Sequence, residues 1–160
     1  TLHATISAAS LAGRHRLIGG DVGAGFALLD VMVWTRIPIH SGGLGQVGSM
    51  ALLFLMAGEK GERVITQRTS LLSQRMWSLG AGSHAEHMAA RREEDRCHAR
   101  IVDHYLRHTW MKTGEEVHAA LLRETEVWLD ADEAVRFGIV DRVEGDGSRA
   151  SRAVVIGGAA

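Results

Sequence analysis

The stretch that decides the fold is Ser-Gly-Gly-Leu-Gly-Gln-Val-Gly-Ser-Met-Ala-Leu-Leu-Phe-Leu-Met, residues 41–56. Small residues lead into Ser49, and nearly every side chain after it is apolar, which predicts a helix buried on most sides. The first turn of a helix carries unpaired backbone N–H groups and the positive end of the helix dipole, so it favours negative charge. Acyl transfer needs such a place beside its nucleophile. Ser49 is therefore the candidate nucleophile, although local sequence alone favours the simpler role of helix N-cap.

Length and composition indicate one domain. The chain has 160 residues, and 18 lysines and arginines nearly balance 19 aspartates and glutamates, so no large field of one sign points to nucleic acid or a membrane surface. The single cysteine, Cys97, excludes an internal disulfide and fits a reducing compartment. The longest apolar run, residues 50–57, is too short to cross a bilayer, and no signal-peptide pattern opens the chain. We expect a soluble, cytoplasmic domain.

Short strands and helices are expected to alternate on both sides of this stretch. Apolar residues from Phe26 to Val33 predict a mostly buried helix that ends near Thr35. Strands are expected near residues 16–18 and at residues 39–41, 62–66 and 70–76. This order is typical of an α/β layer with a largely parallel sheet.

A long helix is predicted for residues 84–109, which contain neither glycine nor proline. Its middle, residues 91–96, is charged all round, so we expect the helix to project from the body or to meet another subunit there. A solvated helix face is the commoner meaning of such a charge run. Capping-box patterns at Thr113 and Asp130 predict two more helices, Gly138 is expected to end the second, and residues 139–143 predict a last strand.

Four segments, in this order, resemble the proteolytic subunit of the Clp protease, a serine peptidase of the crotonase-like fold. They are Gly-Gly-Asp-Val-Gly-Ala-Gly at 19–25, Gly-Gln-Val-Gly-Ser-Met at 45–50, Ala-Gly-Glu-Lys-Gly-Glu-Arg at 57–63 and Trp-Leu-Asp-Ala-Asp-Glu-Ala-Val-Arg-Phe-Gly-Ile-Val-Asp at 128–141. One such motif is weak, but four at this spacing are specific. The resemblance implies an α/β fold of layered sheets with a projecting handle helix. It divides the chain into a short N-terminal segment (1–18), a peptidase domain (19–144) and a flexible tail (145–160).

The resemblance also implies a role for each matched position. Ser49 would be the nucleophile, and the backbone N–H groups of Gly20 and Met50 would form the oxyanion hole. The chain would form homo-oligomeric rings, heptameric and stacked in pairs, which the helix from His84 interlocks. An AAA+ unfoldase would feed unfolded polypeptide into this chamber for ATP-dependent proteolysis. The resemblance implies no cofactor, metal, nucleic acid or membrane.

The chain departs from the family pattern at the catalytic base and acid. The family has a histidine in the strand after the nucleophile helix, whereas residues 70–75 read Ser-Leu-Leu-Ser-Gln-Arg. The position of the base falls on Ser73, on Gln74 or in a gap, and none of these accepts a proton as imidazole does. The aspartate ahead of the C-terminal motif is also missing. Glu124 and Glu126 are the candidates for a displaced acid, although ordinary charged residues at a helix end are the simpler interpretation.

Three functions therefore stay open. The first is an active Clp-type serine endopeptidase with an altered base, and the second is a catalytically inactive subunit of a mixed ring. The third is a crotonase-type enzyme on acyl-CoA, against which the serine and the short chain count. Only eighteen residues precede Gly19, fewer than in the family, which leaves docking of the unfoldase open.

Other motifs weigh less. Ser49 lacks the Gly-x-Ser-x-Gly pattern of α/β-hydrolase esterases. Two histidine pairs, His84 with His87 and His104 with His108, have a spacing that can bind zinc, but no further ligand completes either pair. His40, in the strand before the glycines, is the histidine that we would look for beside Ser49.

Overall fold

A computed structural model describes residues 2–3, 21–76 and 81–145. Its helices are α1 (Val22–Trp34), α2 (Met50–Met56), α3 (His84–His108), α4 (Gly114–Ala120) and α5 (Ala131–Arg136). Its strands are β1 (Leu2–His3), β2 (Ile39–Gly43), β3 (Gln46–Gly48), β4 (Arg63–Thr66), β5 (Ser70–Ser73), β6 (Val127–Leu129) and β7 (Arg142–Glu144). The strand expected near residues 16–18, Gly20 and residues 146–160 of the predicted tail lie outside the described residues.

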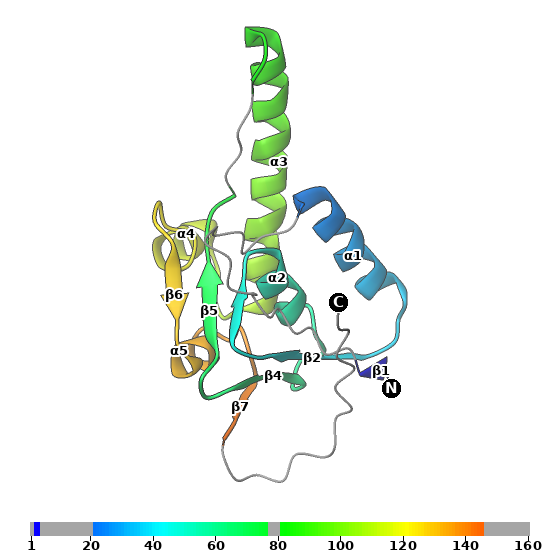
Figure 1. Ribbon diagram of the computed structural model, residues 1–160, viewed down its shortest axis with the longest axis vertical. Coiled ribbons are helices and arrows are strands. Elements are labelled where there is room, and N and C mark those ends of the chain that lie inside the picture. The colour runs from blue at the N-terminus through cyan, green and yellow to red at the C-terminus, as the bar shows by residue number, and fades with distance from the viewer. Residues whose placement is uncertain (1, 4–20, 77–80, 146–160) are drawn as a thin grey trace, which may run out of the picture.

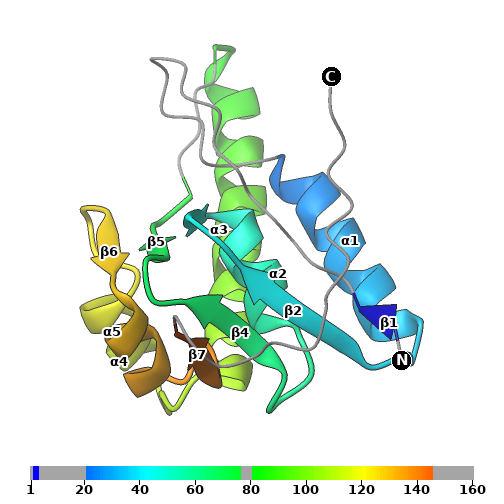
Figure 2. The ribbon, with the colours of Figure 1, turned by 60° about the horizontal axis from the view of Figure 1, so that its bottom comes forward.

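The strands form two sheets, which confirms the α/β fold of layered sheets (Figures 1 and 2). The first sheet has the order β1-β2-β4-β7 and is parallel throughout. In the second, β3-β5-β6, the central β5 is parallel to β3 and antiparallel to β6. The chain passes from the first sheet to the second after β2 and again after β4. Gly45, at φ 72°, makes the first crossing, and its carbonyl accepts the Ser70 N–H from the second at 2.8 Å.

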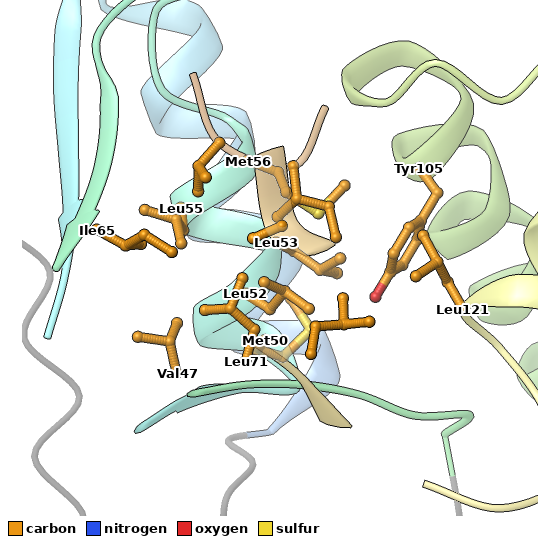
Figure 3. Packing of buried hydrophobic residues seen from close by; sticks show 14 of the residues in the cluster. Val47, Met50, Leu52, Leu53, Leu55, Met56, Ile65, Leu71, Tyr105 and Leu121 are labelled. Carbon is orange, nitrogen blue, oxygen red and sulfur yellow. The ribbon is translucent and has the colours of Figure 1, made fainter. Parts of the chain in front are cut away.

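Helix α2 is the centre of the core, as its sequence predicted. Five of its seven residues are buried, and they pack against Val47, Ile65 and Leu71 from the strands (Figure 3). Tyr105 and Leu121 approach the same cluster from the far side (Figure 3). Because α2 is surrounded by other elements, the residue that precedes it, Ser49, is held by the best-packed part of the molecule.

Helix α1 ends where expected but begins at Val22, four residues before Phe26, and the prediction that it is mostly buried is wrong. Only Gly25 and Leu29 are buried, whereas Leu28 is 47%, Val31 48% and Trp34 83% exposed. The helix is apolar all round, so its sequence could not show which stripe faces the core. One stripe packs on α2, where Gly25 lies against the side chain of Met50.

Helix α3 confirms the long projecting helix (Figure 1). A capping box between Ser83 and Glu86 starts it, and all side chains of residues 84–93 are exposed. Only Ile101 and Tyr105, near its other end, are buried. The pairs Arg91–Asp95 and Asp103–Arg107, whose members lie one helical turn apart, form at 3.8 and 2.8 Å on the surface, where they contribute little stability.

The C-terminal third follows the sequence pattern with one shift. Both predicted capping boxes form, at Thr113 for α4 and at Asp130 for α5, and Gly138 takes φ 76° just after α5. The last strand, however, begins at Arg142 instead of residue 139. Ile139 and Val140 are apolar because they are buried in the turn that precedes the strand.

A buried ion pair joins the first sheet to this C-terminal region. The side chain of Arg63 is 3% exposed and donates from Nε to the Asp141 carboxylate at 2.9 Å, and from Nη1 to the His108 carbonyl at 2.9 Å. Burial alone would raise the pKa of Asp141, but the hydrogen bonds and charge of Arg63 lower it overall. This pair fastens the end of α3 to β4 and is a structural contact.

Candidate active site

Ser49 lies in a sharp turn between β3 and α2. Its backbone has φ 54° and ψ −129°, a left-handed conformation that is strained for any residue except glycine. Its N–H donates to the Leu72 carbonyl on β5 at 3.1 Å, and its carbonyl accepts the amide of Leu52 at 3.0 Å. The turn is therefore held in place by hydrogen bonds on both sides of the strained residue.

The hydroxyl of Ser49 does not cap the helix. Ser49 occupies the N-cap position, yet its side chain makes no capping hydrogen bond, and it is only half-buried. The structure therefore does not support the simpler interpretation, that the Ser49 side chain serves as a helix cap. A strand, a strained serine and a helix in succession are also the geometry of a nucleophile elbow, even though the usual glycine pattern is absent.

Met50, one of the two expected oxyanion donors, follows this turn directly. Met50 is the first residue of α2, so its N–H has no partner within the helix. Its side chain is buried, which fixes the backbone position. Gly20, the other expected donor, lies outside the described residues, so the pairing of the two N–H groups stays a prediction.

The position next to Ser49 on the neighbouring strand holds Ser73. In the parallel pair of β3 and β5, Gly48 is in register with Leu72, so the residues that follow each of them lie at the same edge. Ser73 is fully buried, donates to the Leu121 carbonyl at 2.7 Å and lies 2.6 Å from the Tyr105 hydroxyl. Because the Ser73 proton goes to the carbonyl, Tyr105 donates to Ser73.

This network contains no group that accepts a proton at neutral pH. Burial raises the pKa of Tyr105 to about 12, against which the hydrogen bond to Ser73 acts only in part. Gln74, the other position considered for the base, is half-buried just after β5, and its amide is not a base. The sequence did not reveal the hydrogen bond between Ser73 and Tyr105, because the two residues are 32 positions apart. The one hint was that the only tyrosine of the chain lies on the apolar stripe of α3.

The two candidate acids lie on the surface. Glu124 and Glu126 are both exposed in the segment that joins α4 to β6. Within residues 21–76 and 81–145, neither is hydrogen-bonded to Ser49, so the structure does not bring them together with the candidate nucleophile. Their simpler interpretation, as ordinary charged residues, fits this placement.

Histidines near the core make other contacts. His40 Nδ1 lies 3.7 Å from the Glu62 carboxylate in the first sheet. His104 Nε2 lies 2.9 Å from the Leu53 carbonyl, and burial lowers the pKa of His104 to about 4, so the neutral ring donates this hydrogen bond. In the described part of the chain, the Ser49 hydroxyl has no histidine as a hydrogen-bond partner.

The described part of the chain contains five helices. None of its helices combines the length and the apolar character that crossing a bilayer requires.

Comparison with known proteins gives a family match and curated relatives. The family model described as Clp protease matches residues 17–146. A curated protein of Streptococcus gordonii, described as an ATP-dependent Clp protease proteolytic subunit, is 27% identical over 126 residues, which are 78% of this chain. The aligned part is 63% of that relative, so the chain matches less than two thirds of the relative's length.

Proposed function

Since the chain belongs to the Clp protease family, we propose that it is a serine-peptidase subunit in which Ser49 is the nucleophile and the usual base is missing. The observation that carries this proposal is the turn itself. Ser49 keeps a strained left-handed backbone and a hydroxyl free of any capping bond. A purely structural serine would satisfy its hydroxyl and relax its backbone, as Ser73 does.

The proposed chemistry is acyl transfer. The Ser49 Oγ attacks a peptide carbonyl and forms a tetrahedral intermediate, and the Met50 N–H stabilises its oxyanion, with Gly20 as the second donor. In a complete triad a histidine removes the hydroxyl proton as the bond forms. Here that proton must pass to solvent, because Ser73 already donates to the Leu121 carbonyl and Tyr105 keeps its own proton.

The expected rate follows from what remains. When a serine protease loses its triad, the oxyanion hole and substrate binding still give about 1,000- to 10,000-fold acceleration over water. We therefore propose slow cleavage of unfolded polypeptides, faster than this background because Ser49 still acts as the nucleophile, but well below the rate of a complete subunit.

A second candidate is a catalytically inactive subunit of a mixed ring. The bond between Ser73 and Tyr105 favours it, because it fills the neighbouring strand position with a closed hydrogen-bond network. In this case the chain would contribute its fold and surfaces to the particle. The family match does not favour the third alternative, a crotonase-type enzyme on acyl-CoA.

Ring assembly is proposed on two surfaces. One surface is the row of exposed apolar side chains along α1, from Leu28, Val31 and Trp34. A continuous exposed apolar patch is typical of a surface that contacts another protein. The outer part of α3 projects from the body, and every side chain of residues 84–93 is exposed, which suits a handle between two rings (Figure 1). We propose homo-oligomeric rings, heptameric as in the family, stacked in pairs and served by an AAA+ unfoldase.

Peptide hydrolysis tests the activity. We expect the chain to cleave a fluorogenic peptide slowly, and Ser49→Ala to lower the rate to the background that the oxyanion hole and substrate binding alone supply. Ser49→Thr is a matched control, because it keeps a hydroxyl but adds a methyl group to a crowded turn, and it should fall between the two. An identical rate for the natural chain and Ser49→Ala would reject Ser49 as a nucleophile and leave the inactive subunit.

Sedimentation tests the assembly. Replacing Leu28 and Val31 by glutamate should shift the particle to smaller species without unfolding it, because both side chains are about half exposed in the monomer. The control is Asp30→Ala on the same helix, which should leave the particle size unchanged. A monomeric natural chain would contradict the ring proposal.

A further inference from the structure

Two histidines that the proposed chemistry does not use meet between α3 and α4. His98 comes from the middle of α3 and His118 from the last turn of α4. Their Nε2 atoms are 3.2 Å apart, their ring centroids are 4.9 Å apart, and the rings are nearly perpendicular at 89°. Both side chains are half-buried. The pair joins the long projecting helix to the body.

The distances fit two ligands of one metal ion. Zinc binds imidazole nitrogen at about 2.0–2.1 Å, and in tetrahedral coordination two such nitrogens lie about 3.3 Å apart. The observed Nε2 separation is 3.2 Å. With nitrogens this close, a collinear N–H···N bond would hold the centroids farther apart than the observed 4.9 Å. The two Nε2 directions therefore converge at an angle, as they do on a shared ion.

Carboxylates lie one helical turn before His98. A cavity of 220 Å³ is lined by His98 together with Glu94 and Asp95, and also by Arg75, Met76 and Arg91. Its two guanidinium groups balance the two carboxylates, so the walls neither concentrate nor repel cations strongly. Within the described residues, no three histidine, cysteine, aspartate or glutamate side chains are arranged to hold a metal ion. The two imidazoles would thus be the protein ligands, and water from the cavity would complete the coordination.

We propose that His98 and His118 together bind one divalent transition-metal ion, zinc or its neighbours copper and nickel, and thereby fasten α3 to α4. Imidazole is a preferred ligand of these borderline metals, whereas magnesium and calcium select oxygen. Neither ring is held by a backbone carbonyl in the described structure, so both are available to turn onto the ion.

The surroundings of His98 lower its pKa. Burial is the largest cause, followed by the charges of His118 and Arg75, and Asp95 acts against them. Arg75 itself donates from Nε to the Leu122 carbonyl at 2.7 Å.

The other histidine pairs are poorer sites. His104 and His108 lie with centroids 4.4 Å apart, but His104 Nε2 is hydrogen-bonded to the Leu53 carbonyl. His84 and His87 are both exposed at the start of α3. The sequence pointed to these two pairs because their members lie within one helical turn. The pair that the fold brings together is 20 residues apart.

Titration calorimetry with zinc chloride on the full chain tests the proposal, with magnesium chloride as the negative control. We expect one zinc ion per chain and a higher melting temperature with zinc, but no magnesium binding. Losing even an outer partner of a metal ligand costs about 10- to 100-fold in affinity, so His98→Gln and His118→Gln should each cost at least that. His84→Gln, on the exposed part of α3, is the matched control and should leave zinc affinity unchanged.

The NMR signals of the histidine rings give a second measurement that needs no variant. Zinc should shift the signals of two rings together, in proportion to the calorimetric saturation. The proposal is overturned if zinc does not bind, if binding survives both glutamine variants, or if no pair of rings responds.

Discussion

Ser49 and Ser73 stand at the ends of two neighbouring parallel strands and differ in almost every physical respect. Ser49 follows β3 with a left-handed backbone, is half-buried and makes no capping bond. Ser73 ends β5, is fully buried and has both a donor and an acceptor for its hydroxyl. The same side chain is thus strained and available on one strand, and relaxed and committed on the next.

The two serines show the difference between a side chain that stabilises the fold and one in a conformation typical of active sites. A buried hydroxyl with complete hydrogen bonding stabilises the core and specifies how its elements pack. Strain in the backbone lowers stability and persists only where the surrounding structure enforces it, and it gathers at active sites. In the proposed function, the strained turn at Ser49 is the part of a peptidase site that this chain retains, whereas Ser73 at the neighbouring position belongs to the core.

The largest effect is expected from Ser73→His, which places an imidazole beside the candidate nucleophile. The site is fully buried, so the larger ring should overpack the core and displace the Tyr105 hydroxyl. Overpacking and the lost hydrogen bonds should together lower the free energy of unfolding by about 4 kcal/mol. Urea denaturation measures this, and peptide hydrolysis should not rise. If Ser73→His instead cleaved peptide faster and kept the stability of the natural chain, a histidine at this position would fit beside the Ser49 turn.

Ser73→Ala should have the next largest effect. It leaves the Tyr105 hydroxyl and the Leu121 carbonyl buried without a partner, and each such group costs about 1–3 kcal/mol. Tyr105→Phe is the matched variant, because it keeps the bond from Ser73 to Leu121 and should cost only about 1 kcal/mol. Equal losses in the two variants, measured by urea denaturation, would show that the network is not organised around Ser73.

Alkaline pH should weaken the same network. The pKa of Tyr105 is about 12 in the folded protein, above its ordinary value of 10 in the unfolded chain. Above pH 10 the unfolded chain therefore binds fewer protons, and the free energy of unfolding should fall by about 1.4 kcal/mol per pH unit until pH 12. Tyr105 is the only tyrosine, so phenolate absorbance reports it directly. Tyr105→Phe should remove this part of the pH dependence; an unchanged slope in that variant would contradict the assignment.

The smallest effect on the free energy of unfolding is expected at Ser49, where glycine should relieve backbone strain. Glycine adopts a left-handed backbone without strain, whereas alanine does not. Ser49→Gly should therefore be more stable than Ser49→Ala by about 1 kcal/mol, measured by thermal or urea unfolding of the two variants side by side. If Ser49→Gly were the less stable of the pair, the turn would not be strained in solution.

Most of the fold could be predicted because local signals decided it. The capping boxes at Thr113 and Asp130 and the apolar run of α2 each specify an element without reference to the rest of the chain. Strand β3 was not predicted, since it contains glutamine, valine and glycine and forms only because β5 lies beside it. The burial of α1 was predicted wrongly because a helix that is apolar all round carries no sign of its inner face.

The candidate site was predictable only in part. The glycines, Ser49 and the apolar helix lie together in sequence, so the turn could be inferred. The Ser73–Tyr105 bond and the His98–His118 pair each join residues far apart along the chain, and no local spacing reveals them.

Labelling with a fluorophosphonate probe, with and without added imidazole, tests the central claim most directly. If Ser49 has its turn and oxyanion donor but lacks its base, the natural chain should label slowly at Ser49, and imidazole should accelerate the labelling by acting as the base. Ser49→Ala should not label under either condition. No labelling of the folded natural chain, even with imidazole, would contradict the claim that this turn is the retained half of a peptidase site.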